Sequence, residues 1–570
     1  MKMKDKRAGW CIRVVVIVVT VLLILGILDN LAFTTQTATI TGSISGTVYY
    51  PGPKTGKVYV MAFKATEDYW EDQQRIREIQ TKKELYKSAH SFVSLNTPGR
   101  YRILNLEGGS YRIWAWMDVN DDGDVDFANF EEPTGWYQTP PDDLGLVAVE
   151  VSSETVTNNI HIRLLTPTPF PKGDKKVEYG EGGGTLKTIK GRKVLHLWGA
   201  PEERTYAHGY LTGPQIMDWL NYVAVEYFAG SASDYENRVL EKQTHYIWPE
   251  EVKAELDAML DGMQDSGTDL YSSLLGRFIT RNDLYALQDW GEWWCSGATV
   301  WGKWTQNEEL DGGLIQGKNM DGETDLRKTT VNDLLILANE PADTTKAKWI
   351  GLNWPGFIGE YNGMNQYGVT AVTHAGNSPA NWEPTDFYTV PLIYREVMER
   401  AHSISEAIEI IFSYKSSAGG PGIMGEIINM ASPYFEDREG HPAAVFEGDS
   451  CGGIARYPDD VPPSDPYTIL VTNTFFKYKG GKPRPLAKCD RYRDMVETLE
   501  QFRRKGKAIG TEEMVKILQS ATRGDTAYSN ILYPNKMSIA VATESLCDGT
   551  KNLNAPHCEF TVYEWRELFE

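Results

Sequence analysis

Cysteine and histidine are scarce in this chain of 570 residues, with 6 and 9 copies. No zinc-ligand spacing, phosphate-binding loop, Gly-x-Ser-x-Gly elbow or dinucleotide fingerprint occurs, which counts against the usual cofactor-dependent enzyme classes. Basic residues are few, 57 against 78 acidic ones, and the net charge of -21 would repel phosphate backbones. Nucleic acid is therefore not an expected partner. No repeat with a solenoid period is present either.

Glycine, tyrosine and tryptophan are abundant, with 52, 30 and 17 residues, a profile typical of β-rich structure with aromatic-lined clefts. The hydrophobic share of 41% and the charged share of 24% are those of a chain that buries a sizeable core. At roughly 100–200 residues per domain, the length indicates several domains.

The N-terminal segment predicts export. Residues 1–9 are rich in lysine and arginine, and residues 10–33 are mostly apolar. This pattern is typical of a signal peptide or a single-pass anchor, with residues 1–9 in the cytoplasm. We expect a cell-membrane protein with an extracellular C-terminal portion, or a secreted protein if the segment is cleaved. Disulfides persist outside the cytosol, and Cys547 and Cys558 bracket a short polar loop that a disulfide could close.

Residues 34–166 predict a small all-β sandwich. The segments SISGTVYY, KVYVMAF, YRILNL and SYRIWAWM alternate apolar and polar residues, and glycine, proline or asparagine separates them. Their order resembles the prealbumin-like, carboxypeptidase-regulatory-like sandwiches of secreted proteins. Residues 167–186, which are rich in proline and glycine, predict a linker.

The stretch DVNDDGDVDFANFEEP within this sandwich predicts a calcium loop. Oxygen-bearing side chains stand at alternate positions and a glycine follows, as in the first half of an EF-hand loop. The expected ligands are Asp118, Asn120, Asp122, Asp124 and Asp126. The glutamate that usually ends such a loop is missing, and Glu131 or Glu132 would substitute for it. A solvated acidic turn is the alternative, and a structural calcium ion is the only cofactor that we expect.

Residues 187–570 predict an α+β domain. Segments 216–228 and 250–263 have helical spacing, whereas ATVWGKW, LIQGKNM, GVTAVTH, YTILVTN and MSIAVATES are short strand-like runs. Strands grouped with segregated helices favour a layered arrangement.

Two neighbouring segments of this domain predict a β-hairpin that brings a thiol and a carboxylate together. CSGATVWG begins at Cys295, and GKNMD ends at Asp321. With YAHGYLTGPQI, WPGFIGEYNGMNQYGVTAVTH, VTNTFF and CDRYRDM, these segments resemble the C45 peptidase, or acyl-coenzyme A:6-aminopenicillanic acid acyltransferase, family. That family belongs to the N-terminal-nucleophile hydrolases, which are related to choloylglycine hydrolases. The resemblance implies a four-layer αββα fold for residues 187–570.

The resemblance also implies roles for individual side chains. Cys295 would be the nucleophile, freed as a new N-terminus by cleavage of the bond that precedes it. Asp321 would bind the freed α-amino group, and Asn473 would help to hold the substrate carbonyl and its oxyanion. Arg491 would organise the surroundings of the nucleophile.

Two positions depart from the family pattern. Lys318 replaces an arginine of the catalytic set and lacks its bidentate fork, and the bulky Trp294 precedes the nucleophile. Both departures keep open a catalytically inactive surface-binding protein, and a phospholipase B-like acyl hydrolase is a further alternative. His208 and His374 lie in matching segments and are interpreted as structural, but in an active chain that stays uncut they would be the first candidate bases.

The expected reaction is hydrolysis or acyl transfer of a small N-acylated amine or amide. An α-amino group has a pKa of about 7.7–8.0, so near neutral pH it can accept the proton of its own residue's thiol. The thiolate then attacks the amide carbonyl and forms a thioester on Cys295, which water or an acceptor amine resolves. No metal or organic cofactor takes part.

Overall fold

The computed structural model describes residues 41–570 with short gaps. The gaps are 51, 67–85, 124–131, 138–147, 230, 290–293, 322–326, 360, 377–385, 387, 417–419, 421–424, 437–439, 462, 464, 479–488, 523–525 and 547–551. The expected cytoplasmic residues 1–9 and the expected anchor 10–33 lie outside the described residues. Among the residues that are described, no helix has the length and apolar character needed to cross a membrane.

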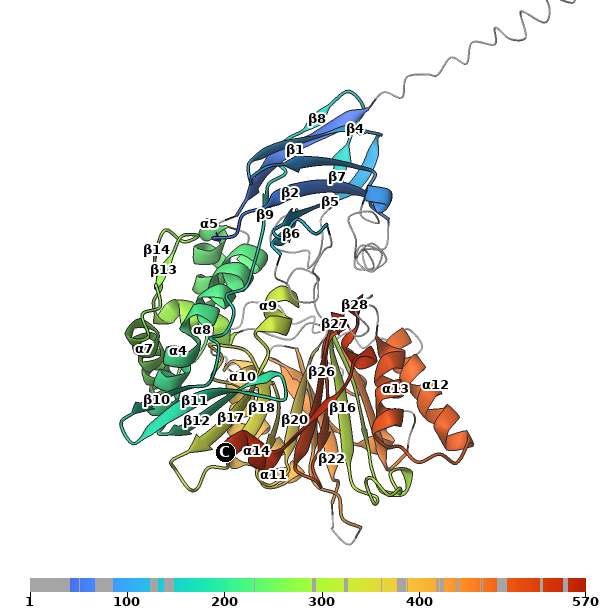
Figure 1. Cartoon of the computed structure of the whole chain (residues 1–570). Helices are drawn as coiled ribbons and strands as arrows, with labels where there is room; N and C mark the ends of the chain where they lie inside the picture. The colour runs from blue at the N-terminus through green and yellow to red at the C-terminus, as the bar shows by residue number, and fades with distance from the viewer. Residues whose placement is uncertain are drawn as a thin grey trace, which may run out of the picture.

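The N-terminal unit consists of two stacked sheets (Figure 1). The first contains β4 (Arg100–Leu106), β1 (Gly42–Tyr49), β8 (Val156–Thr157) and β9 (Ile162–Arg163). The second contains β3 (Ser91–Leu95), β2 (Lys57–Lys64), β5 (Gly109–Asp118), β6 (Thr134–Trp136) and β7 (Val149–Val151). Every second side chain of a strand points to one face, so Ile44, Val60 and Ala115 meet in a common core between the sheets.

Two large sheets form the C-terminal unit. One has ten strands in the order β10 (Lys175–Tyr179), β11 (Gly182–Ile189), β12 (Arg192–Gly199), β17 (Leu335–Pro341), β18 (Trp349–Asn353), β19 (Asn362–Asn365), β20 (Thr370–Ala375), β21 (Glu426–Ala431), β22 (Ala443–Asp449) and β23 (Gly452–Arg456). The other has six, in the order β24 (Thr468–Thr472), β15 (Trp294–Val300), β16 (Ile315–Asp321), β25 (Thr526–Tyr533), β26 (Ser538–Thr543) and β29 (Thr561–Glu564). Two short pairs are β13 (Tyr271–Ser272) with β14 (Arg277–Phe278), and β27 (Ser545–Leu546) with β28 (Asn552–Leu553).

Helices occupy the remaining chain of this unit. The longer ones are α4 (Pro201–Asp218), η1 (Trp219–Ala229), α7 (Glu250–Asp265), α8 (Arg281–Gln288), α10 (Val390–Arg400), α11 (Ile404–Ser413), α12 (Asp490–Arg504) and α13 (Thr511–Ala521). The shorter ones are α5 (Ala232–Asp234), η2 (Tyr235–Leu240), α6 (Glu241–Gln243), η3 (Gly302–Trp304), α9 (Arg327–Asn332), η4 (Pro458–Asp460), η6 (Ala555–His557) and α14 (Trp565–Phe569).

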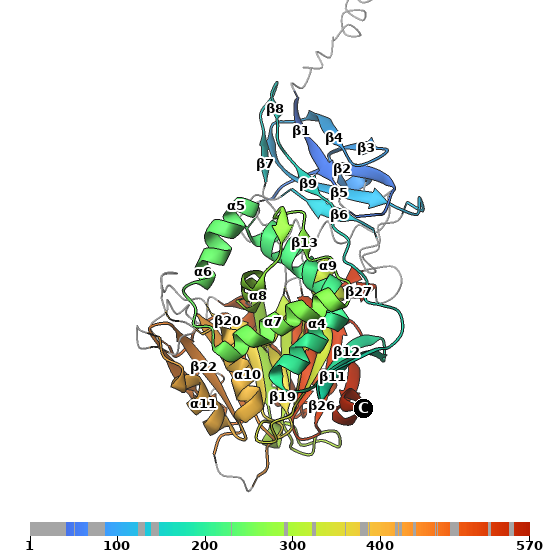
Figure 2. The same ribbon diagram turned by 90° about the vertical axis from the view of Figure 1, so that its left-hand side faces the viewer.

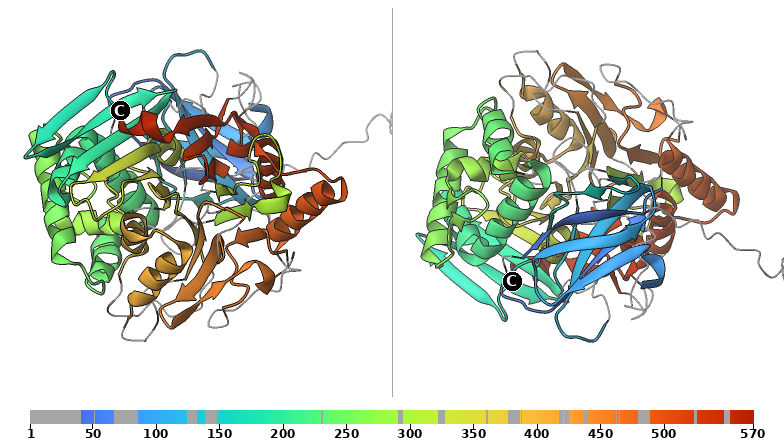
Figure 3. Two further views of the ribbon diagram at one scale, coloured as in Figure 1. Left: turned by 90° about the horizontal axis from the view of Figure 1, so that it is seen from below. Right: turned by 90° about the horizontal axis from the view of Figure 1, so that it is seen from above.

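The two large sheets pack face to face and carry helices on their outer faces. Trp301 and Ile469 of the six-stranded sheet meet Val445 of the ten-stranded sheet in the apolar layer between them. Helices α12 and α13 cover the outer face of the six-stranded sheet, and α4, α10 and α11 cover that of the ten-stranded sheet. Figures 1 and 3 show these helix groups on opposite sides of the strands. The expected α+β class is confirmed, and the layers follow the order αββα.

The sandwich lies at one end of the two large sheets (Figure 2). The chain between the two units is shorter than the predicted linker 167–186, because β10 and the start of β11 already belong to the ten-stranded sheet. The glycines there serve close packing: a Cβ on Gly184 would lie 2.8 Å from Leu197 and 3.0 Å from Ala207. The expectation of a linker over this whole range was therefore wrong at its C-terminal end.

A buried ion network joins three helices of the C-terminal unit. Arg395 of α10 donates to Glu255 of α7 at 2.7 Å and to Glu399 of its own helix at 3.2 Å. Arg204 of α4 donates to Glu399 at 3.3 Å. These four side chains are at most 7% exposed, so each charge depends on its partners to offset the cost of leaving water.

Replacing Arg395 with methionine should lower the free energy of unfolding of this unit by about 3–5 kcal/mol, because the buried carboxylate of Glu255 loses its ion-pair partner and Glu399 keeps only Arg204 and Lys346. The matched control is Arg400→Met on the same helix, where the side chain is 54% exposed and pairs with Glu396 at 2.9 Å. Its effect should stay below about 1 kcal/mol. Urea unfolding of the full chain measures both, and equal midpoints for the two variants would contradict the role given to the network.

Candidate active site

Cys295 is the second residue of β15 and is fully buried. Strand β15 pairs with β16 so that Cys295 lies opposite Met320 and Trp294 lies opposite Asp321. On its other side β15 pairs with β24, whose last residue is followed by Asn473. The hairpin expected from CSGATVWG and GKNMD is present.

Arg491, in the first turn of α12, forms hydrogen bonds with three of the expected site residues: Cys295, Asp321 and Asn473. Its Nη1 donates to the carbonyl oxygen of Cys295 at 3.0 Å and to Oδ2 of Asp321 at 2.9 Å. Its Nη2 donates to Oδ1 of Asn473 at 2.7 Å. The same Oδ1 accepts the main-chain N–H of Cys295 at 2.8 Å. One planar guanidinium thus joins the main chain of β15, the end of β16 and the residue after β24 to helix α12.

Two of these contacts differ from the roles that the resemblance implies. Asp321 accepts from Arg491 and, at 2.6 Å, from the hydroxyl of Thr526, while Asn473 takes the N–H of Cys295. The Nδ2 of Asn473 donates to the carbonyl oxygen of Ala375 at 2.8 Å. In the uncut chain, therefore, this amide donor is engaged with the neighbouring sheet, and its expected role toward an oxyanion remains a prediction.

Lys318 lies on the inner face of β16, opposite Gly297. Its Nζ donates to Oδ1 of Asn362 at 2.8 Å and lies 6.0 Å from the centre of the Tyr528 ring. The strands alternate, so Cys295 and Gly297 share the face that carries Lys318. Lysine at this position therefore places a buried positive charge in the layer of the thiol, without the fork of an arginine.

The thiol of Cys295 is held in its protonated form in this closed state. Burial raises its pKa well above 9, the charge of Asp321 raises it further, and Arg491 opposes the shift. The main-chain N–H of Ala375 forms a hydrogen bond with the sulfur and also lowers the pKa. These contacts place the sulfur beside the end of β20.

Glu426 is a buried carboxyl near the site that the motif search did not identify. Burial raises its pKa to about 8, and the hydroxyl of Thr373, which donates to it, and Lys318 oppose the shift. Glu426 is paired with Ala375 across β20 and β21, but it belongs to the face toward α10. A charged residue inside the apolar run EIINMA was the signal that sequence reasoning could have used.

Glu447 fixes the loop that follows Asn473. Its Oε2 accepts three consecutive main-chain N–H groups, from Phe476 at 3.0 Å, Lys477 at 2.7 Å and Tyr478 at 2.9 Å. Its Oε1 accepts from Arg456 at 2.7 Å. The carboxylate is fully buried, so all of its charge is directed at these donors.

The cysteines differ in their pairing. Cys295, Cys451 and Cys489 form no disulfide. Cys295 is buried, Cys489 is partly exposed and Cys451 is exposed. Cys558 is disulfide-bonded to a partner outside the described residues. Cys547, the partner expected from the sequence, is one of the residues that are not described.

Comparison with solved structures gives partial similarities. A Caenorhabditis elegans N-acylethanolamine-hydrolyzing acid amidase ortholog is 16% identical, with a TM-score of 0.31 over 42% of this chain and 93% of its own. A conjugated bile acid hydrolase from Clostridium perfringens is 13% identical, with a TM-score of 0.29 over 47% and 96%. Penicillin V acylase from Agrobacterium tumefaciens is 9% identical, with a TM-score of 0.27 over 43% and 82%. No family model and no curated protein matches the chain.

The identities and TM-scores are low, so no site residue is assigned by superposition. The role of each residue depends on the contacts of this chain alone.

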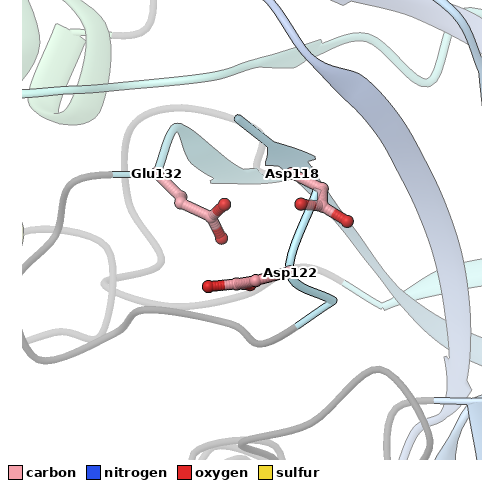
Figure 4. A group of neighbouring side chains, drawn as sticks. All are labelled: Asp118, Asp122 and Glu132. Atoms are coloured by element: carbon pink, nitrogen blue, oxygen red, sulfur yellow. The ribbon is translucent and has the colours of Figure 1, made fainter. Parts of the chain in front are cut away.

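Two of the predicted calcium ligands, Asp118 and Asp122, lie at and just after the end of β5 (Figure 4). Carboxylate oxygens of Asp118, Asp122 and Glu132 lie within 4.8 Å of one another, and Glu132 is one of the two expected substitutes for the missing glutamate. Asn120 donates to Asp122 at 2.7 Å and accepts its main-chain N–H at 3.1 Å. Asp124, Asp126 and Glu131 lie outside the described residues, so the complete ligand set stays a prediction.

Calcium should raise the thermal midpoint of the sandwich in the full chain, because neighbouring carboxylates repel one another until a cation neutralises them. An ion that binds only the folded form adds about 2.7 kcal/mol at 100 times its Kd. Asp122→Asn should abolish the shift, whereas Asp121→Asn at the adjacent exposed position should retain it. Calorimetry with millimolar calcium or with chelator measures this, and identical scans would exclude a calcium site.

Replacing Arg491 with lysine should slow the reaction of Cys295 by roughly 10- to 100-fold. A lysine cannot bond Cys295, Asp321 and Asn473 together, and each hydrogen bond to a charged group contributes about 1.5–3 kcal/mol. The control is Arg493→Lys in the same helix, where the arginine is 49% exposed and pairs with Asp490. Single-turnover kinetics with an N-acyl amine compare the two variants, and equal rates would remove Arg491 from the site.

Proposed function

We propose that this protein is an exported amidohydrolase or acyltransferase that becomes active when Cys295 is released as a new N-terminus. The observation that carries the proposal is a pair of hydrogen bonds to the main chain of Cys295. Its N–H donates to Asn473, and its carbonyl oxygen accepts from Arg491. These contacts fix the residue whose amine and thiol would both take part in the reaction. The proposed substrate is a small N-acylated amine or amide.

The proposed mechanism uses one residue as both nucleophile and base. After cleavage the N–H that Asn473 now accepts becomes an amine, which can take the thiol proton. The sulfur attacks the amide carbonyl of the substrate, the leaving amine takes a proton and departs, and a thioester remains. Water releases the acid, or an acceptor amine takes the acyl group. Asp321 holds Arg491 in place through the 2.9 Å contact, so it acts as a positioning residue.

Two alternatives use the same features. A phospholipase B-like acyl hydrolase would place an ester lipid at the same thiol. An inactive surface-binding protein would keep the fold without turnover. An N-acyl amine assay run beside a lipid-release assay separates the three outcomes.

Cleavage before Cys295 is expected to divide the chain of 570 residues into fragments of 294 and 276 residues. The thiol can attack the carbonyl of Trp294 itself, so no second protease is needed. Cys295→Ala should remain a single chain without activity, and Cys295→Ser should cleave slowly because a hydroxyl is a weaker nucleophile. Denaturing gels, N-terminal sequencing and an amidase assay measure each step.

Cys451→Ala is the matched control, since Cys451 is a free thiol away from the hairpin and should leave cleavage and turnover unchanged. A wild-type chain that is active while entirely uncut would refute the amine as base. A chain that is neither cut nor active toward amides or lipids would leave the binding protein as the remaining alternative.

A further inference from the structure

In the intact chain, before any cleavage at Cys295, the proposed base does not exist. The nitrogen of Cys295 is a peptide amide that donates to Asn473 at 2.8 Å, so it cannot accept a proton. If the thiol itself cleaves the bond to Trp294, some other group must take the thiol proton during that single event. This question rests on the proposed function, and the surroundings of the sulfur provide an answer.

His374 is the ionisable side chain best placed for that step. It precedes Ala375, whose N–H bonds the sulfur of Cys295, so the sulfur lies one peptide unit from His374. The imidazole is fully buried and points at β15: its Nε2 would lie only 3.1 Å from a Cβ on Gly297. Gly297 follows Cys295 by one strand repeat on the same face, roughly 7 Å along the strand. A direct hydrogen bond of about 2.6–3.2 Å is shorter than this offset, so the proton would pass through a bridging water.

The ring of His374 is neutral and so free to accept a proton, and the imidazolium that results is short-lived because its surroundings disfavour the charge. Its Nε2 has no side-chain or main-chain hydrogen-bond partner among the described residues. In the tautomer that carries the ring proton on Nδ1, this nitrogen offers a lone pair. Burial lowers its pKa well below 6.5, and the charges of Lys318 and Arg491 lower it further, so the ring is neutral.

The other ionisable groups near the thiol are less suited. Asp321 is engaged by Arg491 and Thr526. Glu426, on β21, lies on the face of the sheet opposite to His374, where Thr373 of β20 donates to it. A carboxyl with a pKa of about 8 also carries its own proton at neutral pH. Lys318 is a donor, bonded to Asn362.

We propose that His374 accepts the thiol proton of Cys295 during cleavage of the intact chain, and that the freed α-amine replaces it as base in every later turnover. The thiol proton moves to Nε2 as the sulfur–carbon bond to the Trp294 carbonyl forms. The bond from that carbon to the Cys295 nitrogen then breaks, and the nitrogen takes the proton back from the imidazolium. The products are a thioester and a free amine, and water hydrolyses the thioester to regenerate the thiol.

The test separates cleavage from turnover in the full chain. His374→Gln keeps a side chain of similar size but removes the base, and should slow self-cleavage about 100-fold or more. A site-specific protease sequence placed directly before Cys295 allows the same chain to be cut externally. Once cut, the His374→Gln chain should hydrolyse an N-acyl amine within about two-fold of the wild-type chain cut in the same way.

His208→Gln is the matched control, because His208 is also fully buried but accepts the N–H of Gly356 at 3.0 Å in another part of the fold. It should cleave at the wild-type rate if it melts at a similar temperature. In His374→Gly, added imidazole should restore cleavage, whereas pyrrole, a ring of the same size without a basic nitrogen, should not.

Two results would overturn the inference: self-cleavage of His374→Gln at the wild-type rate, or an externally cut His374→Gln chain that stays inactive while folded. The first leaves the proposed function intact, because wild type would still be cut and active. Failure of the proposed function has a different signature. A wild-type chain that is never cut removes the amine as base, and a Cys295→Ala chain that is still cut removes the thiol from the cleavage step.

Discussion

The geometry of the candidate site depends on one guanidinium. Arg491 reaches from the first turn of α12 to the carbonyl of Cys295, to Asp321 and to Asn473, with distances of 2.7–3.0 Å. Without this guanidinium, the carbonyl oxygen of Cys295 and the side-chain oxygens of Asp321 and Asn473 would lie close together without their shared donor. Because the fork is planar and rigid, it also sets how the outer helix layer sits on the six-stranded sheet at the point where β15 begins.

Much of this arrangement was predictable because it is local. The alternation of apolar residues identified the strands that became β15, β16, β24 and β26, and the order of motifs along the chain identified Cys295 as the central residue. Helical spacing likewise predicted the segment that forms α7, over Glu250–Asp265.

The remainder was hidden because it depends on contacts between distant parts of the chain. Thr526, which bonds Asp321, is 205 residues away in sequence, and no local pattern connects the two. The glycines of the predicted linker were misinterpreted because composition does not distinguish a flexible glycine from one that allows close packing, as Gly184 does. His374 was interpreted as structural because its proximity to Gly297 arises only when the two sheets stack.

The contacts of Glu447 determine where this chain could change in length near the candidate site. By binding three successive main-chain N–H groups, it anchors residues 476–478 to the ten-stranded sheet immediately after Asn473. A change in chain length between Tyr478 and the start of α12 would therefore leave residues 476–478 bonded to Glu447. The side-chain amide of Asn473, which accepts the N–H of Cys295, would keep its position. The chain can lengthen or shorten there without disturbing the position of Cys295.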